Sequence, residues 1–540
     1  MVIGTGVKAE AYYSAQIIFK DAFKQSQPFW HQLNGSHWPD GEATPFVAAT
    51  SVSNTNGYPN QDPVGGGWWK THMRASLGGN YEGGTYHVFF DGAATIEVSG
   101  DAVGTIAASG DPITVTPTNE GIHLKLHTIT TAPTYIHVVP AAYVGDYQTA
   151  PFHPDWLATA AHYKVLRWMD CCGVASELAN WANRTVMASQ TQTPKLNRGA
   201  VVNPNYSSYG GGWARYWQDE WGMAIEYMVD VCNALGADMW LCLPAKCTDD
   251  YVTQLCLLVN SRLSPGLKLY LEYGNECWNL NFGGSIWMAI QTNTNPAVQF
   301  PWSNFGYTAG VASNETIPHL AMFYQMWRGS QCMQLARAAF GTSAPTRLVR
   351  VFGTQTAYGS WAFTQAFSHL GLHVNFDAVA PNLYWGHNEA TPWGGSMEEW
   401  KAYCLWKLGE SGVERAADST QEVAVHYGAS MGDELRIIAN TIRSFGKRII
   451  AYEAGQHIVP GDSGQVAEWS AVQQDPIMRD VYLQMMRVWL RICGGDVFCH
   501  YVDVGGWGTS GTWGSRIQIS DATSVKYVAM KDVATGAVML

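Results

Sequence analysis

The sequence predicts an α/β protein: a (β/α)8 barrel with an antiparallel β-sandwich inserted after the first strand–helix unit. From about residue 160 onward, short apolar runs alternate with longer helical patterns, as in parallel strands joined by helices. Residues 45–150 instead carry a period-two pattern rich in Thr and Val, with no long helical segment. We expect residues 1–44 to form the first barrel unit, 45–150 the inserted sandwich and 151–540 the rest of the barrel.

Seven apolar runs are candidates for barrel strands. Strands covered on both faces of a parallel sheet are almost continuously hydrophobic. The runs that fit this description span 164–169, 237–244, 267–273, 347–352, 377–384, 447–453 and 496–502. Because eight units close a barrel, we assign the eighth strand and its helix to residues 15–25.

Five helix candidates lie between these runs, at 219–236, 248–263, 319–341, 432–446 and 476–494. The first ends on Gly236, which suits the left-handed residue that follows a helix. The second begins at Thr248 and Asp249, both good N-caps. Two long insertions, 185–218 and 291–310, follow strands, and we expect them on the face where barrel active sites lie.

The predicted sandwich begins with residues 84–98, which have the pattern of two strands around a hairpin turn at Asp91–Gly92. Three further runs, DPITVTP, GIHLKLHTI and TYIHVVP, continue the alternation. These runs indicate antiparallel sheets, whose role is either to support the barrel or to extend its cleft.

Composition excludes several classes of protein. Apolar residues make up 47% and charged residues only 14%, so a large buried core is expected and disorder is not. The net charge is −12 and no dense basic run occurs, which argues against a nucleic-acid partner. No apolar run reaches the ~18 residues of a membrane span, and no signal peptide is visible. The eleven cysteines lack zinc-ligand spacing, and we expect reduced core cysteines, no metal site and no cofactor.

Two glutamates stand at the ends of predicted strands. Glu276 follows the strand in LEYGNECWN (271–279), and Glu453 ends the strand in RIIAYEAGQ (448–456). Alternation along the first of these strands places Glu272 on the same face as Glu276 but deeper, where a buried carboxylate needs a cation. Arg167, on another predicted strand, is the candidate partner, and we expect Glu272 to be structural.

Paired carboxylates suit the cleavage of a glycosidic bond. One must be protonated to donate to the leaving oxygen, and the other must be ionised to attack the anomeric carbon. Glu276 and Glu453 come from separate strands, so one barrel can direct both into one cleft. Repulsion and partial burial would then separate their pKa values and fix their roles.

On these residues the sequence resembles the large clan of retaining (β/α)8 glycoside hydrolases that includes cellulases, mannanases, xylanases and arabinofuranosidases. Asn275-Glu276 matches the Asn-Glu pair that ends the clan's fourth strand, which implies that Glu276 is the acid/base and that Asn275 binds the sugar 2-hydroxyl. Glu453 matches the glutamate that ends the seventh strand, which implies the nucleophile. The resemblance covers residues 15–44 and 150–530, omits the insertion, and selects no single family.

The same resemblance implies roles for further residues. Arg167 matches an arginine on the second strand that supports the nucleophile, and Tyr384 matches an aromatic residue on the sixth strand that hydrogen-bonds it. Trp507 or Trp513 matches a tryptophan after the eighth strand. Sugar stacking or packing is open for the four candidate tryptophans, and substrate contact or a structural role is open for two histidines: Trp278, Trp385, Trp507, Trp513, His387 and His457.

The function that we expect is endo-acting, retaining hydrolysis of a β-linked polysaccharide by Glu276 and Glu453. One alternative is a non-catalytic glycan-binding or virion-associated protein on the same scaffold. A more remote one is a serine esterase, because residues 428–432 match GxSxG around Ser430, although the preceding run is a poor central strand. The sugar, the linkage and the oligomeric state stay open. An extracellular or virion-associated location would suit a polymer substrate.

Overall fold

A computed structural model provides the structure of the chain. It describes all 540 residues except 10, 33–53, 64, 175–178, 194, 198–217, 221, 280–281, 311–315, 357–358, 386–387, 390–403, 405–407, 409–430, 461–462 and 510. Within that part, no helix is long and apolar enough to cross a membrane.

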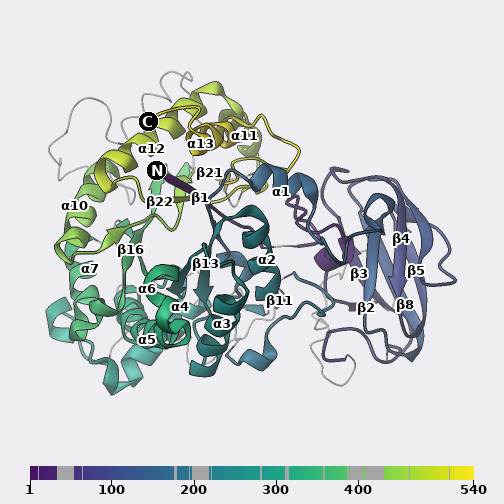
Figure 1. Ribbon diagram of the computed structural model, residues 1–540, viewed down its shortest axis with the longest axis horizontal. Coiled ribbons are helices and arrows are strands. Elements are labelled where there is room, and N and C mark those ends of the chain that lie inside the picture. The colour runs from purple at the N-terminus through teal and green to yellow at the C-terminus, as the bar shows by residue number, and fades with distance from the viewer. Residues whose placement is uncertain are drawn as a thin grey trace.

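The centre of the molecule is a closed parallel barrel (Figure 1). Its strands, in chain order, are β1 (Val2–Gly6), β10 (Val165–Arg167), β13 (Asp238–Leu243), β14 (Leu269–Tyr273), β15 (Leu348–Thr354), β16 (Ala378–Pro381), β19 (Arg448–Ile449) and β22 (Val497–His500). A parallel bridge between Ala451 and Phe498 joins the seventh strand to the eighth and closes the ring. The predicted barrel is therefore confirmed, and each of the seven predicted apolar runs contains or overlaps one of these strands.

Helices surround this barrel between successive strands (Figure 1). They are α1 (Pro154–Ala160), α2 (Ile225–Leu235), α3 (Asp249–Arg262), α4 (Gly283–Thr294), α5 (Ile317–Phe340), α6 (Ala344–Arg347), α7 (Gly359–Phe367), α10 (Met431–Ser444), α11 (Val466–Gln474), α12 (Pro476–Cys493) and α13 (Val525–Thr535). Gly236 ends α2 at φ 61°, and the Thr248 side chain accepts a hydrogen bond from the backbone N–H of Tyr251 in α3, as predicted. Part of the predicted insertion 291–310 is helical, because α4 extends to Thr294.

The first barrel strand is not where the sequence analysis placed it. Residues 15–25 hold no barrel strand; they contain a bridge at Phe19 and a short 3-10 helix, Ala22–Gln25. The first strand is β1, which was not recognised because its two glycines interrupt the apolar run. A Cβ at Gly4 would lie 2.6 Å from Cys499 Sγ and 2.9 Å from the carbonyl oxygen of Val165, so the close packing of neighbouring strands requires glycine.

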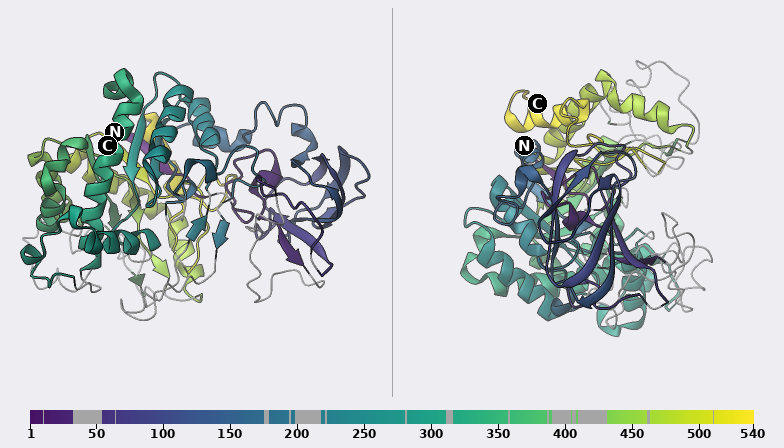
Figure 2. Two further views of the ribbon diagram at one scale, coloured as in Figure 1. Left: turned by 90° about the horizontal axis from the view of Figure 1, so that it is seen from below. Right: turned by 90° about the vertical axis from the view of Figure 1, so that its right-hand side faces the viewer.

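Two four-stranded antiparallel sheets lie to one side of the barrel (Figures 1 and 2). Their orders are β2-β3-β8-β5 and β6-β7-β4-β9, and a hydrophobic cluster with residues from both sheets fills their interior. The strands are β2 (Trp30–Gln32), β3 (Trp68–Met73), β4 (Gly84–Phe90), β5 (Ala93–Gly100), β6 (Ala102–Val103), β7 (Asp111–Val115), β8 (Ile122–Thr131) and β9 (Ile136–Pro140). All of them precede α1, so this β-rich region, residues 30–140, lies between the first barrel strand and its helix.

The hairpin predicted at Asp91–Gly92 is wrong. The strands on either side, β4 and β5, belong to different sheets, so the turn carries the chain from one sheet to the other. The Asp91 carboxylate accepts hydrogen bonds from the backbone N–H groups of Thr134 (2.6 Å) and Tyr135 (3.1 Å). The Asp91 side chain therefore binds the backbone just before β9, and the turn does not join β4 and β5 as a hairpin.

The sixth and seventh barrel strands break and resume at their carboxyl ends. After β16 and β19 the chain continues as β17 (Leu383–Trp385) and β20 (Ala454–Gln456), which pair in parallel. The backbone N–H of Leu383 donates to the carbonyl oxygen of Glu453 at 2.9 Å. The break fixes Tyr384 and Glu453 at the rim of the barrel. Two further two-stranded sheets complete the described strands: β11 (Lys195–Asn197) with β12 (Gln218–Glu220), and β18 (Asn388–Glu389) with β21 (Val459–Pro460).

The cysteines confirm the prediction of reduced core thiols. All eleven are free, and nine of them are buried.

A buried ion pair after the eighth strand gives a test of the fold. Asp503 accepts hydrogen bonds from the fully buried Arg516 (2.7 Å) and from the Tyr163 hydroxyl (2.9 Å). Asp503→Ala leaves the guanidinium buried without its carboxylate and should lower the free energy of unfolding by about 3–5 kcal/mol. The matched control, Asp230→Ala, breaks a half-exposed pair with Arg262 and should cost at most about 1 kcal/mol. Denaturant titration measures the free energy of unfolding of both variants. Equal losses would contradict the view that the Asp503–Arg516 pair is buried and the Asp230–Arg262 pair is not.

Candidate active site

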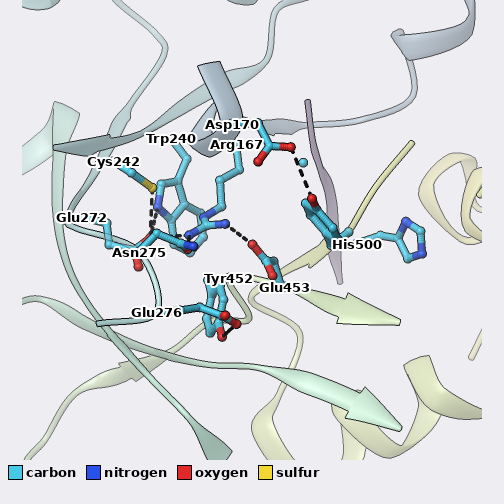
Figure 3. Close-up of polar contacts among 12 residues, drawn as sticks. Arg167, Asp170, Trp240, Cys242, Glu272, Asn275, Glu276, Tyr452, Glu453 and His500 are labelled. Atoms are coloured by element: carbon cyan, nitrogen blue, oxygen red, sulfur yellow. Dashed lines mark hydrogen bonds and ion pairs between the residues drawn. The ribbon is translucent and has the colours of Figure 1, made fainter. Parts of the chain in front are cut away.

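A buried arginine lies at the centre of the carboxyl-terminal end of the barrel (Figure 3). Arg167 ends β10, and its side chain is fully buried. Nη1 donates to Glu453 Oε1 at 2.6 Å, and Nη2 donates to Glu272 Oε2 at 2.9 Å and to Asn275 Oδ1 at 2.7 Å. One planar guanidinium thus joins residues from the second, fourth and seventh strands.

Glu272 is the fixed partner of this arginine, as the sequence analysis expected. Its Oε2 also accepts hydrogen bonds from Trp240 Nε1 at 3.0 Å and from Cys242 Sγ at 3.4 Å, both on β13. A Cβ at Gly353 on β15 would lie 2.4 Å from Glu272 Oε1, so only glycine leaves room for the carboxylate. With its donors supplied by protein and only 1% of its surface exposed, Glu272 orients Arg167 and is not placed to meet a ligand.

Glu453 is held between a cation and a phenol. Its Oε1 accepts from Arg167, and its Oε2 accepts from the Tyr384 hydroxyl at 2.6 Å. Burial raises the pKa of the Glu453 carboxyl to about 8; Arg167 opposes this rise, the charge of Glu276 adds to it, and the Tyr384 hydrogen bond opposes it. Arg167 and Tyr384 thus favour the ionised carboxylate, while burial and the Glu276 charge oppose it.

Glu276 lies just past the strand and not on it. The alternation expected through residue 276 stops at Tyr273, because Gly274 and Glu276 both have left-handed backbones, at φ 73° and 42°. The turn directs the Glu276 carboxylate toward the seventh strand, where Oε1 accepts from the Tyr452 hydroxyl at 2.7 Å and Oε2 accepts from Asn279 Nδ2 at 2.8 Å. Neutral donors hold this second carboxylate, in contrast to the guanidinium that holds Glu453.

Tyr452 connects the two glutamates. It precedes Glu453 in the chain, donates its hydroxyl to Glu276, and presents its ring to the Arg167 guanidinium at 4.9 Å. Figure 3 shows the Glu276 and Glu453 side chains on the same side of the barrel end, below Arg167. The charge of Glu276 raises the pKa of the Glu453 carboxyl, so the two carboxylates lie close enough to interact.

Only one of the two polar atoms of the Asn275 side-chain amide has a hydrogen-bond partner among the described residues. Its Oδ1 accepts from Arg167, while its Nδ2 is buried and has no hydrogen-bond partner among the described residues. The amide N–H bonds are therefore oriented by the protein but not used by it.

The predicted aromatic residues fall into two groups. Trp278 lies edge-on to Tyr452 with ring centroids 6.2 Å apart, and Trp513 lies beside His457 at 5.8 Å. His457 itself packs against Tyr384 at 5.6 Å, so these side chains border the glutamates.

The other predicted residues either contact groups away from the glutamates or lie outside the described part of the structure. Trp507 covers the buried amine of Lys526. Trp385 is 1% exposed and donates to Met485 Sδ on α12, which favours packing, one of the two roles left open for it. His387 and Ser430 lie outside the described residues.

The sequence analysis missed three residues of the site. Tyr452 was not predicted as a site residue, although it directly precedes Glu453 in the chain. Tyr501, which directly follows β22, donates to Asp170 at 3.3 Å, and Asp170 follows the second strand. Their places after barrel strands could have marked both. Among the described residues no group of three or more His, Cys, Asp and Glu gathers to hold a metal ion.

Fold and site together define a (β/α)8 barrel with two glutamates at the ends of its fourth and seventh strands. No protein-family model and no curated protein sequence matches the chain. Solved structures that resemble it are barrel glycoside hydrolases.

Three of these structures have the following sequence identity, coverage and TM-score. A β-glycosidase from the hyperthermophile Thermosphaera aggregans is 10% identical over 72% of this chain and 84% of its own, with a TM-score of 0.35. An endo-1,4-β-D-mannanase from Thermotoga petrophila RKU-1 is 12% identical over 71% and 93%, with a TM-score of 0.33. A Bacteroidetes-affiliated GH5 cellulase is 10% identical over 70% and 82%, with a TM-score of 0.34.

The raised pKa of Glu453 predicts a pH-dependent stability difference between wild type and Glu453→Gln. Between about pH 4.5, where the carboxyl ionises in the unfolded chain, and about pH 8, where it ionises in the folded protein, the folded state binds more protons. The free energy of unfolding of the wild type should therefore fall as pH rises through this window. Glu453→Gln cannot lose this stability, because its amide does not ionise. Denaturant titrations should therefore show the free energy of unfolding of the variant rising relative to that of the wild type up to about pH 8. A difference that is flat with pH would contradict the assignment.

Proposed function

We propose that the protein is a retaining glycoside hydrolase that cleaves β-glycosidic bonds in a polysaccharide by double displacement. One observation carries the proposal: Glu453, bound by Arg167 and Tyr384, lies beside Glu276, bound by Tyr452 and Asn279, at the carboxyl end of a parallel barrel. Barrel active sites occur at that end. Two carboxylates in different environments are the requirement of this chemistry.

In the first step Glu453 is the nucleophile. An ionised Oε attacks the anomeric carbon while the bond to the leaving oxygen breaks, and Glu276 gives that oxygen its proton. Arg167 and Tyr384 orient the attacking carboxylate and favour its ionised form against the effect of burial. As the covalent ester forms, Glu453 loses its charge and Glu276 gains one, so the site keeps the same net charge throughout.

In the second step Glu276, now ionised, takes a proton from water as that water attacks the anomeric carbon. The ester bond to Glu453 breaks, and the product keeps the configuration of the substrate. This geometry requires the two carboxyl groups to be about 5–5.5 Å apart.

Asn275 is the proposed contact to the sugar beside the reacting carbon. Its buried Nδ2, which lacks a partner among the described residues, is oriented by the bond from Arg167 to its Oδ1. A donor in that position suits the 2-hydroxyl, because hydrogen bonds to this group strengthen in the transition state.

The finer features of the proposal concern the polymer. Endo action is proposed because the aromatic residues Trp278 and Trp513 border the glutamates and suit a cleft with several sugar sites. We also propose that the two antiparallel sheets form an inserted β-sandwich domain, which with β2 (Trp30–Gln32) begins before the expected residue 45, and that the rest of the chain forms the barrel. Their common hydrophobic cluster supports that division.

A screen of soluble β-glucan, mannan and xylan, with anomeric NMR of the products, tests this function. The expected result is hydrolysis of at least one polymer with the β-anomer formed first. Glu276→Ala should lower kcat by about 10²–10⁴-fold through loss of the proton donor, and added azide should restore turnover by forming a β-glycosyl azide. The matched control, Glu97→Gln, changes an exposed glutamate of the β-rich region and should retain full activity. Initial formation of the α-anomer, or an unimpaired Glu276→Ala, would contradict the proposal.

A further inference from the structure

A cavity of about 520 Å³ lies between the barrel rim and the β-rich region. This volume is within the range of small-molecule binding sites. One wall comes from segments that follow barrel strands, and the other comes from the loop between β3 and β4. The residues that matter here are Lys8, Tyr13, Leu77, Asn80, Asp170 and Gln518.

Tyr501 connects this cavity to the glutamate pair. Its hydroxyl donates to Asp170 at 3.3 Å and accepts from Lys8 Nζ at 3.4 Å, and both of these residues line the cavity. In the view of Figure 3, Glu453 lies between Asp170 and Glu276. The charge of Asp170 acts on the Glu453 carboxyl, so this wall of the cavity lies near Glu453, and in that view Asp170 and Glu276 lie on opposite sides of that carboxyl. Because the leaving group must lie against the proton donor Glu276, the cavity faces the part of the chain that stays with the nucleophile.

The wall from the β-rich region is held rigidly. The Arg74 guanidinium at the start of the loop donates to Gln25 Oε1 at 2.5 Å and to the carbonyl oxygen of Phe19 at 3.1 Å. The backbone N–H of Ser76 donates to the carbonyl oxygen of Asn119 at 2.9 Å, and that of Gly78 donates to its side chain at 3.0 Å. The loop therefore presents Leu77 and Asn80 in a fixed arrangement.

The segment that connects the two parts is also anchored to the barrel. Gln190 Nε2 donates to Ser26 Oγ at 2.8 Å, and Lys24 Nζ donates to the carbonyl oxygen of Met187 at 2.8 Å. Because both walls are fixed by hydrogen bonds, the cavity has a defined shape.

The lining has the chemistry of a site for an uncharged sugar. Tyr13 is 46% exposed and offers a ring face, against which the apolar face of a pyranose can pack. Asn80 is exposed and offers its amide oxygen to hydroxyl groups, while its Nδ2 donates to the carbonyl oxygen of Leu77 at 2.8 Å. Gln518 is half-exposed and offers a second amide. Lys8 and Asp170 are the charged side chains among the described lining residues, and their charges cancel. An anionic sugar would gain nothing from this balance.

We propose that this cavity binds the sugar that precedes the cleaved residue on its non-reducing side, and that the β-rich region thereby forms part of the active site. The substrate class that follows is an uncharged polysaccharide, cleaved with at least two sugars bound on the nucleophile side. This inference rests on the proposed function, since it needs a glycosidic bond to be cleaved beside Glu453.

Matched pairs of 4-nitrophenyl β-glycosides test the inference: glucoside with cellobioside, mannoside with mannobioside, and xyloside with xylobioside. Each disaccharide adds one sugar on the non-reducing side and leaves the same leaving group. In the pair that the wild type hydrolyses, kcat/KM should be higher for the disaccharide. Tyr13→Ala should lower this disaccharide-to-monosaccharide ratio about tenfold, the size expected when a packed aromatic contact is lost. Asn80→Ala should lower it by a smaller factor.

The control is Tyr135→Ala, which removes an equally exposed tyrosine of the β-rich region that does not line the cavity and should keep the wild-type ratio. If the wild type cleaves polysaccharide or glycosides but its ratio is one, or if Tyr13→Ala keeps the full ratio or slows both members equally, the cavity is not this subsite while the proposed function stands. If no glycoside and no polymer is cleaved, the proposed function fails and the subsite fails with it.

Discussion

The arrangement of this site depends on one buried guanidinium. Arg167 is removed from water and can be accommodated only if acceptors converge on it from other strands. Glu272 on β14 and Glu453 at the end of the seventh strand provide those acceptors, and Asn275 provides a third. Such a buried pair adds little to stability, because desolvation offsets the attraction. Its effect is positional: it fixes the carboxylate of Glu453 at the barrel rim.

The chemistry that we propose follows from the contrast between two carboxylates. Glu453 is bound by a cation and Glu276 by neutral donors, so the two carboxylates lie in different electrostatic environments. Tyr452 couples the two, since it bonds Glu276 and lies against Arg167. In the proposed reaction Glu453 is the nucleophile, and Glu276 acts as the acid in the first step and as the base in the second.

The barrel and its glutamates could be predicted from the sequence because both leave local signals. Buried parallel strands are mostly apolar, as in β13 and β14, and a carboxylate that directly follows such a strand is conspicuous. The first strand lacked that signal, because Gly4 replaces an apolar side chain where strands pack closely. The turn at Asp91 could not be predicted either, since the same residues suit a hairpin or a crossing between sheets. Contacts such as that of Tyr452 with Glu276 depend on a left-handed turn that the strand pattern does not encode.

Covalent trapping with a 2-deoxy-2-fluoro β-glycoside of the sugar that the enzyme cleaves tests the central claim most directly. The fluorine slows both steps, and a good leaving group lets the first outrun the second, so the glycosyl-enzyme accumulates. Peptide mass spectrometry should then find one fluorosugar per chain, on Glu453 in the segment IIAYEAGQ. A label on Glu276, or complete hydrolysis of natural substrate with no labelled peptide and no inactivation, would contradict the account of Arg167 holding a nucleophile.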